Sequence, residues 1–184
     1  MRFTSGCSAE LRPALMQRLA RYRHRVFVET LGWQLQCRNA LEYDQFDRDD
    51  TLYVIAQNAE GDVIGTARLL PTTRPYLLSE VFPTLLNGAQ PPRSPDVWEL
   101  SRFAAMDFSG QTGTALEQFS SPITTGLLRA ASRCAMAQGA QRMVTVSPLG
   151  VERLIRRTGF EHHRLGPPML VDNQPLFACS IRCE

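Results

Sequence analysis

With 184 residues the chain has the size of one domain, and we expect a single domain over residues 1–184. Its hydrophobic content of 43% and charged content of 21% are typical of a soluble globular protein. A net charge of +2 is too small to indicate nucleic-acid binding, and no apolar run approaches the roughly 20 residues that a membrane helix needs. We therefore expect a cytoplasmic protein that binds neither nucleic acid nor membrane.

The residue types that are present exclude some kinds of chemistry. All 20 basic residues are arginine, so Schiff-base catalysis through lysine is excluded, and the planar guanidinium groups suit carboxylates and phosphates. The 5 cysteines contain no CxxC pair, which favours reduced structural thiols over a metal or disulfide framework. His162 and His163 have no partner at metal-ligand spacing, so we expect no metal site.

The first part of the chain predicts a helix and then a loop. Apolar residues recur at intervals of three and four from Leu11 to Val26, which indicates an amphipathic helix over about Ala9–Val28. The polar stretch Gln34–Asp50 is expected to form a long loop.

Strand and helix patterns then alternate. The turn signal Glu60-Gly61-Asp62 separates two strands, and Pro71 ends the second. In chain order we expect strands at Thr51–Gln57 and Val63–Leu70, a short helix at Leu77–Leu86 interrupted by Pro83, a strand at Val97–Ala105, a helix at Ile123–Gln138, a strand at Met143–Ser147, a helix at Gly150–Thr158, and closing strands at Phe160–Leu165 and Leu176–Ile181.

This order of elements predicts a three-layer α/β/α sandwich around a central mixed sheet. It is similar to the fold of the acetyl-coenzyme A-dependent N-acetyltransferases. That superfamily holds the cofactor pyrophosphate on an Arg/Gln-x-x-Gly-x-Gly/Ala loop at a helix start. The nearest match here, Gly110-Gln111-Thr112-Gly113-Thr114-Ala115, lacks the leading Arg or Gln, which weakens the case for acetyl transfer from coenzyme A.

A first group of candidate site residues lies at the end of the first helix. Arg23 and Phe27 are four apart and share a helix face, and Gly32 ends the helix before Trp33. These residues are either two core aromatics with a solvated arginine, or a pocket of two aromatic faces with a cation at its rim. Such a pocket suits a ligand with a positive centre and a carboxylate.

A second group consists of charged residues in the long loop and in two strands. Asp44 and Asp47 are three apart, and Arg68 stands among apolar strand residues, where an arginine usually has a carboxylate partner. Glu99 and Arg102 belong to Trp98-Glu99-Leu100-Ser101-Arg102-Phe103, which is either an ordinary strand with a surface salt bridge or part of a site. In a regular strand these two side chains point to opposite faces, so a shared site requires a bulge there.

Taken together, these blocks resemble the acyl-homoserine-lactone synthases, the autoinducer synthases of bacterial quorum sensing. The match covers roughly Arg23 to Pro168 and is carried by Arg23…Phe27…Trp33, Asp44-x-x-Asp47, Gly65-x-x-Arg68-Leu69-Leu70-Pro71-Thr72-Thr73, Pro75-Tyr76-Leu77-Leu78, Val81-Phe82, Trp98-Glu99-Leu100-Ser101-Arg102-Phe103, Gly150-Val151-Glu152-Arg153 and Arg164-Leu165-Gly166-Pro167-Pro168. The chain departs from the family in ending at Glu184, soon after its last predicted strand, and in having Pro148 where a threonine or an aromatic residue is more usual.

The resemblance implies an enzyme with two substrates and no permanently bound cofactor. S-adenosyl-L-methionine would supply an amine that attacks an acyl thioester on acyl carrier protein. The methionyl carboxylate would then close the lactone and release methylthioadenosine. It implies that Phe27, Trp33 and Phe103 bind S-adenosyl-L-methionine and that Arg23 and Arg102 hold its carboxylate. Glu99 would be the general base, and Arg102, Asp44, Asp47 and Arg68 would complete the catalytic cluster.

The resemblance also implies where the acyl donor binds. The acyl chain would contact Phe82, Thr145 and Ser147. Thr145 occupies a position where family members with threonine often prefer 3-oxo chains, although a strand threonine packed in the core fits the sequence equally well. Carrier docking would involve Arg153 and Arg157. Two other functions stay open: a coenzyme A-dependent N-acyltransferase of the same fold, and a catalytically inactive module that senses the adenosyl ligand.

Overall fold

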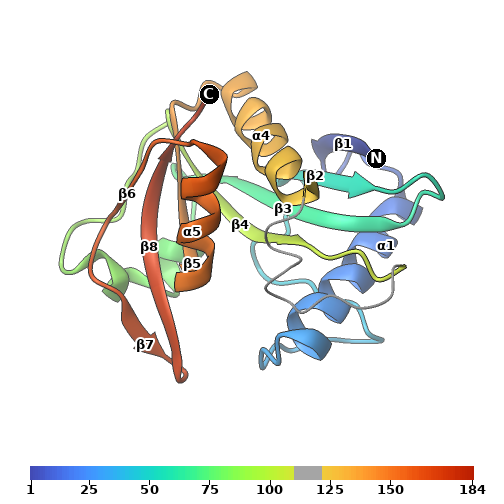
Figure 1. Cartoon of the computed structure of the whole chain (residues 1–184), viewed down its shortest axis with the longest axis horizontal. Helices are drawn as coiled ribbons and strands as arrows, with labels where there is room; N and C mark the ends of the chain where they lie inside the picture. The colour runs from blue at the N-terminus through green and yellow to red at the C-terminus, as the bar shows by residue number, and fades with distance from the viewer. Residues whose placement is uncertain (110–121) are drawn as a thin grey trace. The chain divides into compact units, whose positions relative to one another are not determined.

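The computed structural model describes residues 1–109 and 122–184. The described strands form an eight-stranded mixed sheet in the order β1-β2-β3-β4-β5-β8-β6, with β7 paired to β8 (Figure 1). The chain divides into two compact units, residues 1–68 with 102–128 and residues 69–101 with 129–184. The predicted cofactor loop Gly110–Ala115 lies outside the described residues.

The first unit contains an antiparallel strand pair and the N-terminal helix. Strand β1 (Arg2–Cys7) pairs antiparallel with β2 (Leu52–Gln57). Helix α1 (Pro13–Arg23) continues directly into the π-helix η1 (His24–Thr30). The apolar face of α1 packs on β2 through a cluster of buried residues: Leu15, Met16, Leu19, Tyr53 and Ile55.

Two further strands continue this unit. They are β3 (Val63–Pro71) and β4 (Val97–Ala105), each of which also extends into the second unit. Gly65 in β3 lies under the first part of helix α4 (Pro122–Ala137), since an added Cβ there would lie 3.3 Å from Leu127. Helix α1 packs on one face of the sheet. Because Gly65 has no side chain, helix α4 can approach the sheet closely at this position.

The second unit is built on β5 (Arg142–Pro148) and β8 (Gln174–Arg182). Val97–Glu99 of β4 pair parallel with β5, which in turn pairs antiparallel with β8. Helix α5 (Leu149–Thr158) covers β5 and β8, as the red and orange segments of Figure 1 show. The unit also contains helix α2 (Leu77–Glu80), the 3-10 helix η2 (Pro83–Leu86), β6 (His162–Arg164) and β7 (Met169–Val171).

Most of the predicted elements are present, and the predicted mixed α/β fold is confirmed. One predicted element was wrong in detail, and two strands were missed. The first helix begins at Pro13 rather than Ala9, because Pro13 occupies its first turn, and its last part is a π-helix. Strand β1 was missed because its sequence is mostly polar and does not alternate. Strand β7 was missed because it has only 3 residues.

The turn after β7 carries a signal that sequence reasoning overlooked. Asp172 and Asn173 have φ angles of 48° and 61°, the left-handed pair that a two-residue type I′ hairpin requires. Asp and Asn tolerate this conformation better than most residues, so the dipeptide indicates a hairpin even where the flanking strands are short.

Candidate functional site

An aromatic pair at the end of η1 forms the first part of the site, within the first unit. The chain leaves the helix through Gly32, whose φ of 70° an L side chain rarely adopts, and returns so that the Trp33 amide donates to the Phe27 carbonyl at 2.8 Å. The two rings stack with centroids 4.8 Å apart and an interplanar angle of 27°. Phe27 is buried, whereas Trp33 is partly exposed, so only the outer ring is accessible.

Arg102 lies beside both rings. Its guanidinium carbon is 5.5 Å from the Phe27 centroid and 5.8 Å from that of Trp33. The backbone of β4 departs from regular strand geometry at this residue, where φ is 49°. A left-handed residue within a strand is typical of a β-bulge, so the expected irregularity near Glu99 and Arg102 is present at Arg102. The next residue, Phe103, is half-buried.

Buried ion pairs surround this aromatic pair. Arg23 is 1% exposed; its Nε donates to Glu42, and its Nη1 and Nη2 donate to Asp47 at 2.7 and 2.9 Å. Arg102 donates through Nε and Nη2 to Glu42, and through Nη2 to Asp44 at 2.8 Å. Glu42 therefore joins two buried arginines, and its own amide is tied to the carbonyl of Ala20 in α1.

Arg68 completes the cluster. Its Nη1 lies 2.6 Å from Asp44 and 3.2 Å from Asp47, and the side chain is fully buried. The Tyr53 hydroxyl donates to Asp47 at 2.6 Å. We call Arg23, Glu42, Asp44, Asp47, Arg68 and Arg102 the charge cluster; its three arginines and three carboxylates balance formally.

The surroundings of Glu42 and Asp47 in the charge cluster favour the ionised forms of these two acids. Burial by itself would raise the pKa of Glu42, but Arg23 and Arg102 outweigh it and hold that pKa below its ordinary value. Burial opposes ionisation of Asp47 in the same way, and Arg23 and Arg68 bring its pKa well below the usual range. Burial, and then the neighbouring Asp47 carboxylate, raise the pKa of Tyr53, which stays a neutral donor.

The structure corrects two expectations about these residues. Arg23 was expected at the rim of a pocket, but it lies in the interior with three nitrogens bonded to carboxylates. Glu42 was not selected, although it is the acid that connects Arg23 to Arg102. Nothing in the sequence separates Glu42 from the other acids of the polar loop, because the relevant signal is its distance from residues far along the chain.

Glu99 belongs to the second unit and is buried. Its two oxygens accept hydrogen bonds from the amides of Leu77 and Leu78, at 2.9 and 2.6 Å. These amides belong to the first turn of α2, where backbone N–H groups have no partner within the helix. Two amide donors and the positive end of a short helix stabilise a carboxylate.

The residues expected to contact the acyl chain also lie in the second unit. Thr145 and Ser147 are buried on one face of β5, with their hydroxyl oxygens 3.3 Å apart. Phe82 is partly exposed at the start of η2. The structure thus brings the hydroxyl groups of Thr145 and Ser147 together.

The arginines expected to receive the carrier are exposed on α5. Arg153 and Arg157 are four residues apart on a helix whose other face is buried against the sheet. The neighbouring Glu152 is paired with Arg164 at 2.6 Å, so it does not neutralise them. A basic, solvent-accessible face is therefore present where it was expected.

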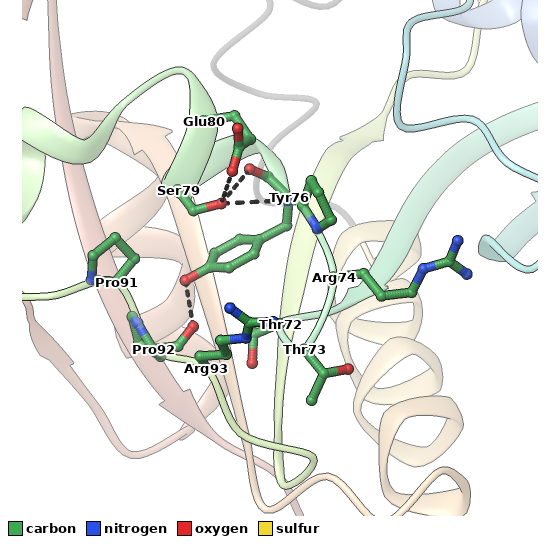
Figure 2. A pocket seen from close by; sticks show the side chains of 10 residues that line it. Thr72, Thr73, Arg74, Tyr76, Ser79, Glu80, Pro91, Pro92 and Arg93 are labelled. Carbon is green, nitrogen blue, oxygen red and sulfur yellow. Dashed lines mark hydrogen bonds between the residues drawn. The ribbon is translucent and has the colours of Figure 1, made fainter.

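A cavity of about 290 Å³ lies beside α2 in the second unit (Figure 2). The Tyr76 ring crosses it and donates from its hydroxyl to the Pro92 carbonyl at 2.6 Å, while Ser79 and Glu80 stand at one side. Burial, and then Glu99 and Glu80, raise the pKa of Tyr76. None of the predicted site residues is among its lining residues, which are Thr72, Thr73, Arg74, Pro75, Tyr76, Ser79, Glu80, Pro91, Pro92 and Arg93.

Residues 1–109 and 122–184 contain no group of three or more His, Cys, Asp or Glu that could hold a metal ion. In the same residues, no helix is long and apolar enough to cross a membrane.

The fold defines a class of protein. A putative N-acetyltransferase from Lactobacillus plantarum has a TM-score of 0.61 at 19% identity, over 100% of both chains, a likeness that concerns the fold alone. The mixed sheet with its helices is thus the acyltransferase fold that the element order predicted.

Sequence relatives give the family. The autoinducer synthase family model matches residues 8–184. An acyl-homoserine-lactone synthase from Acinetobacter nosocomialis is 51% identical over 181 residues, which is 98% of this chain and 99% of that protein. The chain belongs to the autoinducer synthase family and is an acyl-homoserine-lactone synthase, an acyltransferase.

Two solved structures extend the comparison. TofI, in a ternary complex with an inhibitor and MTA, is 43% identical with a TM-score of 0.86, over 100% of this chain and 92% of TofI. The CoA-dependent acyl-homoserine lactone synthase BjaI, with SAM and isopentyl-CoA, is 27% identical with a TM-score of 0.84, over 99% of this chain and 83% of BjaI.

The charge cluster yields a prediction about stability. Glu42→Gln keeps the shape of the side chain but leaves the buried Arg23 and Arg102 without a shared counter-charge. Removing one partner of a buried ion pair costs about 3–5 kcal/mol, and we expect a loss of that order in the free energy of unfolding at pH 7, measured by urea denaturation. The exposed Glu60→Gln is the matched control and should change it by less than about 0.5 kcal/mol.

The same variant should change the response to acid. Because the pKa of Glu42 is lower in the folded state than its ordinary value of 4.5, its contribution is full above that value and is lost as the pH falls through the folded pKa. The wild type should therefore lose stability below about pH 4.5, and Glu42→Gln should lose less over the same range. An equally steep acid response in both proteins would show that Glu42 does not carry this effect.

Proposed function

We propose that this synthase transfers an acyl chain from acyl carrier protein to the amine of S-adenosyl-L-methionine, closes the homoserine lactone and releases methylthioadenosine. The observation that carries the proposal is the stacked pair Phe27–Trp33 with Arg102 beside it, held by the charge cluster. This arrangement offers aromatic faces for a sulfonium and a guanidinium for a carboxylate, the two charges that S-adenosyl-L-methionine carries besides its amine.

In this proposal Arg102 binds the carboxylate of S-adenosyl-L-methionine. Its Nε and Nη2 are engaged by Glu42 and Asp44, and within the described residues no group accepts a hydrogen bond from its Nη1. Arg23 donates to acids through all three of its side-chain nitrogens, so its role is to hold Glu42, which orients Arg102. Trp33, the more exposed ring, would face the adenosyl group, and Phe103 would extend the apolar lining. The MTA in the TofI complex supports an adenosyl-binding role for this fold.

In this proposal Asp44, Asp47 and Arg68 do not contact the substrate but act through Arg102. They bind one another and, through Asp44, fix Arg102. A guanidinium that is bonded on two sides loses little further freedom when it binds a ligand, so the charge cluster prepares Arg102 for the substrate.

Glu99 is assigned the proton transfer that starts the reaction. An ammonium cannot attack a thioester, so a base must remove its proton directly or through a water molecule. The Leu77 and Leu78 amides hold the Glu99 carboxylate in place. The amine lone pair then attacks the thioester carbonyl, and backbone amides of β4 stabilise the oxyanion. Collapse of this intermediate breaks the C–S bond, and the carrier leaves as a thiol after taking the proton that the new amide nitrogen loses.

Lactone closure follows from positioning. The methionyl carboxylate attacks the carbon that bears the sulfonium, the C–S bond breaks, and methylthioadenosine leaves as a neutral thioether. This step needs no acid or base. Holding the chain folded supplies most of the acceleration.

Coenzyme A is the second candidate donor, because BjaI, which has the same fold, is CoA-dependent. One assay separates the two donors: wild type is incubated with S-adenosyl-L-methionine and either octanoyl carrier protein or octanoyl coenzyme A. The products are identified by mass spectrometry. Lactone and methylthioadenosine from the carrier at the higher kcat/KM support the proposal. Higher kcat/KM with coenzyme A supports the second candidate, and adenosyl binding without turnover with either donor would contradict both.

Glu99→Gln should lose about 10²–10⁴-fold in kcat, because the amide keeps the shape but cannot accept the proton. Affinity for S-adenosyl-L-methionine, measured by calorimetry, should stay near that of the wild type. A rate equal to that of the wild type would remove Glu99 from the mechanism.

Trp33→Ala should weaken substrate binding, whereas Glu99→Gln should slow turnover. Loss of a stacking and cation–π face should weaken S-adenosyl-L-methionine binding by roughly 0.5–2 kcal/mol, measured by calorimetry. Trp33→Phe, which keeps an aromatic face, is the matched control and should retain most of the affinity. Unchanged affinity in a folded Trp33→Ala variant would assign Trp33 to the core alone.

Charge reversal on α5 tests whether acyl carrier protein docks there. Acyl carrier proteins are acidic, so the double variant Arg153→Glu, Arg157→Glu should raise the KM for octanoyl carrier protein and flatten its salt dependence. The KM for S-adenosyl-L-methionine should barely change. Arg129→Glu, Arg133→Glu on α4 is the matched control, since both residues are exposed and also four apart. Equal effects from both pairs, or none from the α5 pair, would place docking elsewhere.

A further inference from the structure

A second set of arginines lies on the opposite side of the N-terminal helix from the charge cluster. Arg18, Arg21 and Arg25 are exposed and follow a spacing of three and four along α1 and η1, which places them on one helix face. They line a hollow of about 380 Å³ within the first unit. This volume falls in the range of small-molecule sites.

None of the three arginines forms an ion pair with an acid in residues 1–109 or 122–184. Asp62 is the acid among the residues that line the hollow, so the lining carries a clear excess of positive charge. The contrast with Arg23 is direct, because Arg23 belongs to the same helix and is neutralised by two carboxylates.

An aromatic platform fixes one of these arginines. The guanidinium carbon of Arg25 lies 3.9 Å from the centroid of Phe108. Phe108 in turn meets Tyr22 edge to face at 6.0 Å, and the hydroxyl of Tyr22 accepts a hydrogen bond from the Met106 amide at 2.8 Å. A guanidinium stacked on a ring keeps its N–H edge free to donate, so Arg25 is ordered and still available to an anion.

We infer that this hollow, lined by Arg18, Arg21, Arg25 and Phe108, binds a ligand with a diphosphate group. Planar guanidinium forks suit phosphate oxygens, and about 10 Å of helix separates the first arginine from the third, which is more than one phosphate spans. Inorganic diphosphate and a nucleoside diphosphate share this chemistry. The site is distinct from the amine-substrate pocket, because Phe27, Trp33 and Arg102 are not among the residues that line it.

Calorimetry with inorganic pyrophosphate, ADP and adenosine, in chloride buffer at fixed ionic strength, tests the inference. Pyrophosphate and ADP should bind the wild type, and adenosine should not compete with pyrophosphate, because the proposed adenosyl site is a different one. Tighter binding of ADP than of pyrophosphate identifies a nucleotide ligand, and equal binding identifies the diphosphate alone; either result supports the site. No binding of either diphosphate at millimolar concentration would overturn it.

Amino-acid substitutions test whether pyrophosphate binds in this hollow. Arg18→Gln, Arg21→Gln should lower pyrophosphate affinity at least about tenfold, because two charge-assisted contacts are lost. Two matched controls should leave it unchanged: Arg12→Gln at the start of α1, and Arg153→Gln, Arg157→Gln on α5. A similar loss in either control would show general charge attraction and overturn the inference. All of these residues are exposed, so circular dichroism should show folded variants. Lactone synthesis in phosphate-free buffer is measured in parallel, so that the two proposals can fail independently.

Discussion

The pairing of buried arginines with carboxylates is the constraint on which the candidate site depends. A guanidinium removed from water is tolerated only if acids and hydrogen bonds replace the lost hydration. Here Glu42 binds Arg23 and Arg102, while Asp44 and Asp47 bind Arg68. Since the acids come from a loop without regular secondary structure, these ion pairs also determine where that loop lies.

The same pairs prepare the site for charged ligands. Arg102 is oriented by Glu42 and Asp44 and lies beside the stacked rings of Phe27 and Trp33. Its position therefore depends on acids contributed by the loop and on a left-handed backbone conformation in β4. Such strain persists where the surroundings hold it, and it is typical of functional sites. Glu42 and Asp47 stay ionised because the arginines hold the pKa of each below its ordinary value.

One helix presents arginine in two different roles. Arg23 points into the unit and is neutralised, while Arg18 and Arg25 face solvent without ion pairs within the described residues. A neutralised arginine stabilises structure and positions its neighbours. An arginine that lacks a carboxylate partner and is ordered by a ring is available to an external anion. The residue type is the same, and its surroundings decide which function it can have.

The sequence by itself determined most of the order of elements, the bounds of β4 and the residue blocks that identify the family, because periodicity and motifs are local properties of the chain. It did not determine that Arg23 is buried or that Glu42 completes the charge cluster. Those facts depend on contacts between residues 19 to 60 positions apart, such as Arg23 with Glu42 and Arg102 with Glu42. Only the tertiary structure decides them, because burial and the distance between charges arise when distant segments pack together.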